Sequence, residues 1–539
     1  MSVDAEVRAF LAANAATFER SFSFVSFGVI VKAIVGILAL CALLGSGLTA
    51  LADDNASSAK PSPLPVPTSR DTMTHASVAI GGRQIPYTAT AGTIVLVDEK
   101  SKPTCSMFYT AFTADGGVDL NRRPVTFFYN GGPGSSSVWL RMGSFAPKRV
   151  LSSEAQHTPP SPYRLVDNGY SLLDKSDLVF VDAPGTGFSR IVGLAKPEDF
   201  YGVDQDARAF KQFVERYVSK NKRWNSPKFL FGESYGTTRS AVLVNLLQQD
   251  GMDFNGVVLL SSALNYATFF GGDGLDTEYI GYLPTEAAIA WYHGRIPNRP
   301  PDLAAFLRDV RQFALGDYAR ALLKGNALSD AERADIARKL SAYTGVSEQF
   351  YRHADLRVEP GEFEKELLRD KYRITGRLDG RFLGIDGKAI GDSPDYDPAD
   401  TAFASAYVSA FNMYVRDELG YKSDLFYKPT NYGEISPAWD FHHNIDGNQI
   451  PWPDVVQDLH DAMTQNPELR VFSANGYFDM ATPFFATEYT LDHMALDPSL
   501  RGHISYGFYG SGHMVYLHAA ALAQFKSDLA RWYDSVLHS

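Results

Sequence analysis

A serine flanked by two glycines stands between a predicted strand and a predicted helix. Residues 228–231 read Lys-Phe-Leu-Phe, residues 232–236 read Gly-Glu-Ser-Tyr-Gly, and residues 240–249 carry apolar side chains suited to a helix. Such a tight turn pushes the serine hydroxyl outward, and the glycines let the backbone pass through it. Ser234 is therefore the candidate nucleophile of an acyl-transfer reaction.

A serine hydroxyl needs a base to take its proton and an acid to orient that base. In the α/β-hydrolase fold, where this turn is the nucleophile elbow, the chain order is serine, then Asp or Glu, then His. Asp479 follows the predicted strand 469–473, and His513 follows the predicted strand 503–509. We predict that these two residues complete a catalytic triad with Ser234.

Other interpretations exist for the acid and the base. Asp182 also follows a predicted strand, but it precedes the nucleophile in the chain, and its loop, residues 183–189, looks structural. Asp479 could instead cap a helix before Pro483, and His513 could be an ordinary hydrogen-bonded loop histidine. The order and placement of the candidates favour the triad.

The tetrahedral intermediate of acyl transfer needs two backbone N–H groups aimed at its oxygen. Tyr235, the residue after the nucleophile, is predicted to supply one of them. The other should come from a glycine-rich loop after an early strand. Residues 130–134 read Asn-Gly-Gly-Pro-Gly and directly follow the predicted strand 125–129, although the same residues would also make a plain turn.

Short apolar runs alternate with helical patterns, which predicts an α/β fold. This pattern indicates a mostly parallel central sheet with helices on both faces. Antiparallel strands at 87–96 and 106–112 are expected to open the sheet, and a helix at 518–537 to close the chain. The buried strands are expected at residues 125–129, 178–181, 229–231 and 257–260.

The sheet pattern is interrupted once. We expect residues 76–264 to form the first part of the hydrolase core and residues 466–539 the second. Helix signals dominate between them, including a capping box at residues 329–332. Residues 265–465 are therefore predicted to form a mainly helical inserted cap.

The N-terminus resembles an export signal. Residues 33–52 carry no charge and end in a small-x-small cleavage pattern, so we predict that residues 1–52 are a signal peptide cleaved after Ala52. An uncleaved membrane anchor is the alternative. Residues 53–75, rich in Pro, Ser and Ala, are expected to be a flexible linker. The expected location of the main body is periplasmic or secreted.

The 539-residue chain has a net charge of −12 and no basic runs, which argues against nucleic-acid partners and anionic membranes. After signal cleavage only Cys105 remains, so no intramolecular disulfide is expected. His442 and His443 lie near Asp446, but adjacent histidines usually point apart, and no metal site is predicted. The chemistry requires no cofactor. The sequence does not indicate an oligomeric state.

Several motifs occur together in an order that resembles the serine carboxypeptidase family, over about residues 120–520. The expected absence of disulfides suggests that the chain resembles a bacterial-type member of this family. The resemblance implies an enzyme that removes single residues from the C-termini of peptide substrates. It is carried by residues 130–136, 182–189, 232–236, 475–479 and 512–514.

The resemblance also assigns roles to residues around the nucleophile. It implies that Asn130, Gly131 and Glu233 bind the carboxylate of the substrate. It places the oxyanion hole on the backbone of Gly132, together with Tyr235. A carboxyl group beside a substrate carboxylate should share a proton with it. We therefore expect peptidase KM to rise between pH 5 and 8, unless Glu233 merely fills its place in the elbow.

The sequence departs from the family pattern in three places. Ser135 stands where the family often has a disulfide-bonded cysteine, and Ser144 stands near the expected position of a glutamate that supports carboxylate binding. Residues 237–239, Thr-Thr-Arg, differ from the usual Ala-Gly-His. The alternatives are an esterase or acyltransferase with the same triad, and a catalytically silent hydrolase-fold binding protein.

Overall fold

The computed structural model describes residues 62–67, 71–117, 119–270 and 274–538. The expected signal peptide, residues 1–52, lies outside the described residues, as does most of the expected linker. No helix in the described ranges is long and apolar enough to cross a membrane.

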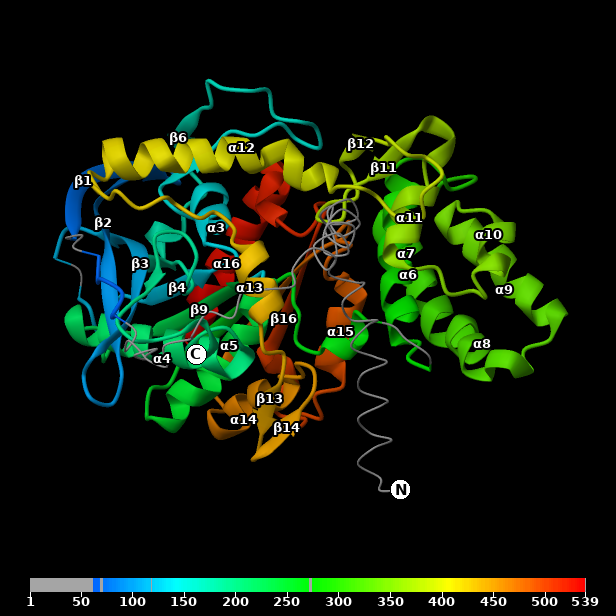
Figure 1. Cartoon of the computed structure of the whole chain (residues 1–539). Helices are drawn as coiled ribbons and strands as arrows, with labels where there is room; N and C mark the ends of the chain where they lie inside the picture. Colours follow the sequence, from blue (N-terminus) through cyan, green and yellow to red (C-terminus); the bar gives the residue numbers. More distant parts are fainter. Residues whose placement is uncertain (1–61, 68–70, 118, 271–273, 539) are drawn as a thin grey trace, which may run out of the picture.

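A ten-stranded sheet forms the centre of the molecule (Figure 1). Its order is β1-β2-β3-β7-β4-β9-β10-β15-β16, and β8 pairs with β3. Pairing is antiparallel from β1 to β7 and parallel from β7 to β16, which confirms the predicted architecture. The strands are β1 (Thr72–Ile80), β2 (Arg83–Val97), β3 (Pro103–Ala114), β4 (Val125–Tyr129), β7 (Asp177–Val181), β8 (Arg190–Ile191), β9 (Lys228–Glu233), β10 (Gly256–Leu260), β15 (Arg470–Gly476) and β16 (Ile504–Tyr509).

Ordered pairing begins inside the segment that the sequence predicts to be a linker. β1 starts at Thr72, which is paired with Ala91, because the 15-residue β2 is long enough to give it a partner. Upstream, Leu64 exchanges backbone hydrogen bonds of 2.7 and 2.9 Å with Gly193. The described end of the expected linker is thus attached to the core.

The two faces of the sheet bury alternate side chains of each strand. Phe128 and Phe231 lie on one face and are fully buried under α3 (Val138–Gly143), α12 (Pro398–Met413) and α16 (Ala519–His538). Phe127 and Leu230 are fully buried on the other face under α4 (Val203–Lys220), α5 (Tyr235–Gln249) and α14 (Val456–Gln465). Cys105 on β3 is buried in this second core, as the sequence indicates.

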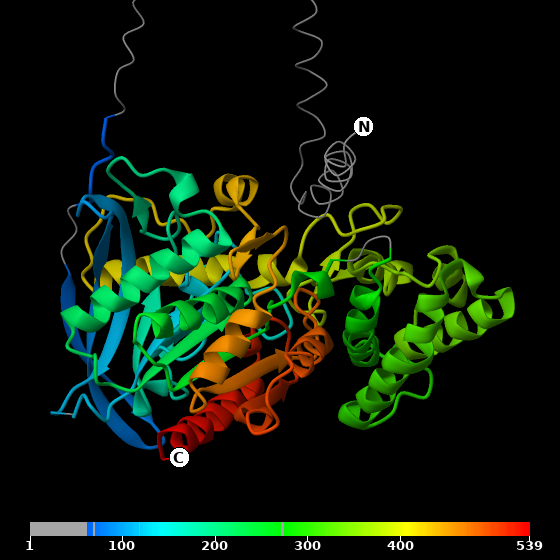
Figure 2. The ribbon, with the colours of Figure 1, turned by 90° about the horizontal axis from the view of Figure 1, so that it is seen from below.

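A helical lobe stands beside the sheet in Figures 1 and 2 and has an apolar core of its own. Side chains that follow β15, among them Phe478 and Phe484, enter this core and join the lobe to the sheet. The predicted capping box is present, since Ser329 and Glu332 cap each other's backbone at the start of α9. The lobe contains α6 (Thr277–Tyr292), α7 (Leu303–Phe313), α8 (Ala319–Lys324), α9 (Asp330–Thr344), α10 (Glu348–His353) and α11 (Pro360–Glu366).

The expected cap, residues 265–465, is divided in the structure. α12 contributes Phe403 and Phe411 to one core of the sheet, and α14 contributes Leu459 and Met463 to the other. Apolar helix faces of this kind are stable only against another apolar layer, which the sheet supplies. The smaller elements are β5 (Lys148–Val150), β6 (Leu165–Asp167), β11 (Arg373–Thr375), β12 (Leu383–Ile385), α13 (Tyr432–Ala438), β13 (His443–Ile445), β14 (Asn448–Ile450) and α15 (Phe484–Asp492).

A buried histidine fastens β13 to two helices. His443 Nδ1 lies 2.6 Å from Asp204 Oδ1 on α4, and its Nε2 lies 2.8 Å from Asp458 Oδ2 on α14. Burial lowers the pKa of His443, but hydrogen bonds and charge from the two aspartates outweigh burial and raise it to about 9. The ring is therefore cationic at neutral pH. The adjacent His442 pairs instead with Asp440 at the surface.

The His443 cluster predicts that stability falls at alkaline pH. Because the folded pKa of about 9 exceeds the ordinary 6.5, the contribution is complete below about pH 6.5 and is lost as pH rises through 9. The shift corresponds to about 3 kcal/mol of unfolding free energy. Thermal unfolding between pH 6 and 10 should show wild type converging on His443→Gln as pH rises. His442→Gln is the matched control, and parallel curves for wild type and His443→Gln would contradict the assignment.

Candidate active site

The turn after β9 holds Ser234 in a conformation that few non-glycine residues adopt, with φ 60° and ψ −130°. A Cβ on Gly232 would lie 2.2 Å from the carbonyl oxygen of Gly236, and a Cβ on Gly236 would lie 2.8 Å from the carbonyl oxygen of Tyr129. The two glycines are thus required by close backbone approach. Ser234 is partly exposed between buried neighbours, so its hydroxyl is presented to solvent.

The structure brings Asp479 and His513 together. Asp479 Oδ2 lies 2.9 Å from His513 Nδ1 and also accepts a hydrogen bond from the Thr482 hydroxyl, which lies 3.1 Å from the same ring nitrogen. Asp479 Oδ1 accepts from the backbone N–H groups of Ala481 and Thr482 at 2.8 and 3.0 Å. These contacts fix the carboxylate and leave His513 Nε2 for another partner.

Ser234 and His513 line one pocket. Within the described residues no hydrogen bond joins them, and catalytic hydrogen bonds are commonly long in the absence of substrate. Burial lowers the pKa of His513, but the charge and hydrogen bond of Asp479, with a contribution from Glu233, outweigh burial and raise it. A carboxylate that stabilises the imidazolium in this way is what a serine hydrolase base requires.

The loop that carries His513 is held by hydrogen bonds to a segment more distant in the sequence, which contains Leu378 and Asp379. The backbone N–H of His513 donates to the carbonyl of Leu378 at 2.7 Å, and that of Gly512 donates to Asp379 at 3.1 Å. Arg381 pairs with Asp379 at 2.6 Å and donates to the carbonyl of Gly510 at 3.1 Å. Sequence reasoning missed this segment, since no local motif marks it.

The glycine-rich loop after β4 packs directly on the elbow. A Cβ on Gly131 would lie 2.5 Å from the backbone nitrogen of Tyr235, so only glycine fits there. Gly132 has φ +112° and lines the pocket with Ser234. The two backbone segments expected to form an oxyanion hole are therefore adjacent to each other.

Asn130 and Glu233 both line this pocket and contact each other. Asn130 Nδ2 donates to Glu233 Oε1 at 2.7 Å, while Asn130 Oδ1 accepts from the backbone of Leu140 at 3.0 Å, which fixes the orientation of the amide. Burial is the main cause that raises the pKa of Glu233, to about 7. Glu233 is therefore protonated in a large fraction of molecules at neutral pH and can donate a hydrogen bond.

Arg239, one of the departures from the family pattern, lies under the elbow. Its guanidinium pairs with Asp206 on α4 at 2.6 and 3.2 Å and donates to the carbonyl of Asn130 at 2.9 Å. Thr237 donates to the carbonyl of Ser234 at 2.7 Å. Arg239 thus fastens the elbow helix to the glycine-rich loop, a role that sequence reasoning did not identify.

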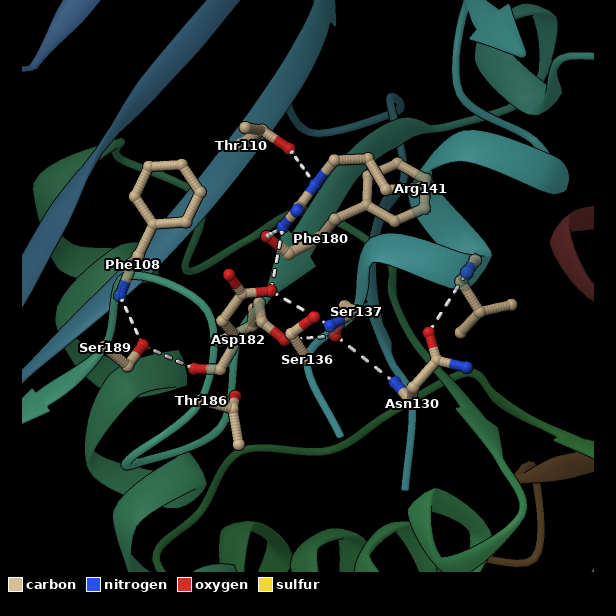
Figure 3. A network of polar contacts seen from close by, with 12 residues as sticks. Phe108, Thr110, Asn130, Ser136, Ser137, Arg141, Phe180, Asp182, Thr186 and Ser189 are labelled. Atoms are coloured by element: carbon tan, nitrogen blue, oxygen red, sulfur yellow. Dashed lines mark hydrogen bonds and ion pairs between the residues drawn. The ribbon is translucent and has the colours of Figure 1, made fainter. Parts of the chain in front are cut away.

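Asp182, the rival acid, belongs to a separate buried network (Figure 3). Its Oδ1 accepts from the backbone of Ser137 at 2.9 Å and from Arg141 at 3.2 Å. Arg141 also donates to Thr110 at 2.8 Å, and the Ser137 hydroxyl lies 3.2 Å from the backbone nitrogen of Asn130. The network supports the glycine-rich loop from behind, and within the described residues it has no hydrogen bond to His513.

The structure also shows the contacts of Ser135 and Ser144, the other two departures from the family pattern. Ser135 accepts a hydrogen bond from the Trp139 indole at 2.8 Å and lines the pocket. Ser144 is fully buried and donates to the carbonyl of Leu140 at 2.6 Å, so its hydroxyl is engaged by its own helix. Neither side chain makes a hydrogen bond to Glu233 in the described structure.

A serine at a strained strand-to-helix turn of a mostly parallel sheet, with an Asp–His pair on later loops, defines an α/β-hydrolase. The crystal structure of KEX1(delta)p, a prohormone-processing carboxypeptidase from Saccharomyces cerevisiae, has a similar fold. It matches with a TM-score of 0.51 at 17% identity, over 83% of this chain and 92% of that chain.

The sequence comparisons identify the family. The model of the family described as serine carboxypeptidase matches residues 86–503, and the chain belongs to this family. Serine carboxypeptidase-like 45 of Arabidopsis thaliana is 25% identical over 40% of this chain and 43% of its own length. The pheromone-processing carboxypeptidase KEX1 of Saccharomyces cerevisiae is 33% identical over 26% of this chain and 19% of its own. The chain thus spans less than half the length of these curated relatives.

Proposed function

We propose that this protein is a serine carboxypeptidase that removes the C-terminal residue of peptides through an acyl-enzyme. The observation that carries the proposal is the paired Asn130 and Glu233 in the same pocket as Ser234 and His513. An amide N–H and a protonated carboxyl beside a nucleophile suit a substrate that presents a free carboxylate next to the bond to be cleaved.

In the proposed mechanism, Ser234 Oγ attacks the scissile carbonyl carbon while His513 Nε2 takes the hydroxyl proton. Asp479 holds His513 in the tautomer with a proton on Nδ1 and stabilises the imidazolium. The backbone N–H groups of Gly132 and Tyr235 receive the oxyanion. His513 then protonates the leaving amine and the C–N bond breaks. In the second half, His513 takes a proton from water as the water oxygen attacks the ester carbonyl carbon; the bond to Ser234 Oγ breaks, and His513 returns the proton to Ser234.

An esterase or acyltransferase would use the same triad, so the substrate must separate these functions. A blocked dipeptide, its C-terminal amide and its ethyl ester differ only at the group that Glu233 and Asn130 would bind. Preference for the free acid in kcat/KM at pH 5.5 supports the carboxypeptidase. Equal or better cleavage of the ester and amide favours an esterase. A folded protein that a fluorophosphonate fails to label would be a binding protein.

The protonated form of Glu233 predicts a pH-dependent KM. With a pKa of about 7, Glu233 becomes a carboxylate above neutral pH and repels the substrate carboxylate. KM for the acid substrate should rise about tenfold from pH 6 to 8. Glu233→Gln keeps a donor and stays neutral, so its KM should be flat over that range.

The amide substrate, which lacks the second carboxylate, should show a smaller rise with either protein. Glu468→Gln, at an exposed position, is the matched control. A rise in KM that persists unchanged in Glu233→Gln would remove this role from Glu233.

We also propose that residues 1–52 direct export, with a periplasmic or secreted location for the mature enzyme. The support is the uncharged run and the cleavage pattern in the sequence. N-terminal sequencing of the protein isolated from its native cells tests this, with a start at Asp53 as the expected result.

A further inference from the structure

Two buried polar atoms near the active site have no hydrogen-bond partner in the described part of the chain, although each of the two groups shifts the pKa of the other. Oε2 of Glu233 and the hydroxyl of Tyr516 both lack a partner among the described residues. Both side chains are 3% exposed. Tyr516 lies in the turn Val515–Leu517, three residues after His513. A buried polar group without a partner is uncommon and points to a function at that position.

The ring of Tyr516 packs against Gly143, where a side chain would collide with it. A Cβ on Gly143, at the end of α3, would lie 2.5 Å from Cδ2 of Tyr516 and 2.7 Å from the hydroxyl of Tyr407. Glycine at this position therefore admits the ring. The hydroxyl of the following residue, Ser144, donates to the carbonyl of Leu140 in its own helix.

Glu233 and Tyr516 each change the pKa of the other. Burial raises the pKa of Tyr516, and the charge of Glu233 raises it further. Burial likewise raises the pKa of Glu233, whereas His513 and then Tyr516 lower it. A hydroxyl that donates to a carboxylate stabilises the ionised form and so lowers its pKa.

We propose that Tyr516 is a positioning residue for Glu233: its hydroxyl donates to Oε2 of the ionised carboxylate and thereby sets the pH above which the pocket stops binding a peptide carboxylate. This inference rests on the proposed function. Tyr516 is not among the residues that line the pocket and has no role in bond cleavage.

Other groups also face Glu233, but none of them can replace Tyr516. Asn130 already donates to Oε1. His513 and Asp479 act on Glu233 through charge and cannot be changed without disrupting the triad candidates. Burial raises the pKa values of two tyrosines on other elements, Tyr407 of α12 and Tyr432 of α13, and Glu233 adds a smaller contribution to each through its charge and not through a hydrogen bond.

The test is binding without turnover, in a Ser234→Ala background. Calorimetry measures the Kd of a blocked dipeptide and of its C-terminal amide from pH 5.5 to 8.5. Adding Tyr516→Phe should move the rise in Kd of the acid upward by about one pH unit, because the donor to the carboxylate is lost. Binding at pH 8 becomes about fivefold tighter than in the background, while binding at pH 5.5 is unchanged.

Tyr533→Phe is the matched control, since Tyr533 is a buried tyrosine whose hydroxyl bonds Thr126 in the interior. Gly143→Ala, which displaces the Tyr516 ring, should shift the profile in the same direction and serves if Tyr516→Phe does not fold. An unshifted profile in a folded Tyr516→Phe protein overturns the inference. A background protein that binds acid and amide equally at pH 5.5 overturns the proposed function instead.

Discussion

Replacement of Ser234 by alanine is expected to lower kcat for a blocked dipeptide by about 10⁵- to 10⁶-fold. In the proposed mechanism the acyl-enzyme bond forms only to Ser234 Oγ, so loss of this oxygen prevents formation of the acyl-enzyme. Binding should survive, because Asn130 and Glu233 are unchanged. The residual rate should come from the oxyanion donors and substrate positioning alone.

The control for this variant is Ser535→Ala, at an exposed serine of α16. Wild type and Ser535→Ala should both react with a fluorophosphonate, and mass spectrometry should locate the adduct on Ser234. Labelling of a folded Ser234→Ala protein, or activity within tenfold of wild type, would show that another residue is the nucleophile.

Asparagine at position 479 is expected to lower kcat by about 10⁴-fold while the protein stays folded. Both oxygens of Asp479 accept hydrogen bonds, and Oδ2 faces Nδ1 of His513 at 2.9 Å. An amide nitrogen in that place can donate to Nδ1, which puts the ring proton on Nε2. His513 then cannot take the proton of Ser234.

Asp182→Asn is the matched control, because it makes the same chemical change at the rival acid. Asp182 pairs with Arg141, whose side chain is fully buried. Loss of its charge should destabilise the protein by about 3 kcal/mol. The folded fraction should keep kcat near the wild-type value. A larger loss of kcat in Asp182→Asn than in Asp479→Asn would transfer the role of the acid to Asp182.

The sequence by itself determined the sheet and the order of the candidate residues. Short runs of apolar side chains predict buried parallel strands, as in β4 and β9, since both faces of such a strand are covered. The glycines around Ser234 predict a turn because backbone approach there admits no Cβ. The positions of Asp479 and His513 after two late strands follow from the common edge at which parallel strands end.

Only the tertiary structure decided which residues support that edge. Arg239 reaches Asp206 and Asn130 across 33 and 109 positions of the chain. Tyr516, which follows a different strand from Glu233, shifts the pKa of that residue. Arg381 also contacts residues that are distant in the sequence. The helical patterns of α12 and α14 do not reveal that these helices pack on the sheet rather than in the lobe. Side-chain pairing between distant segments depends on where the fold places them, and local periodicity carries no record of it.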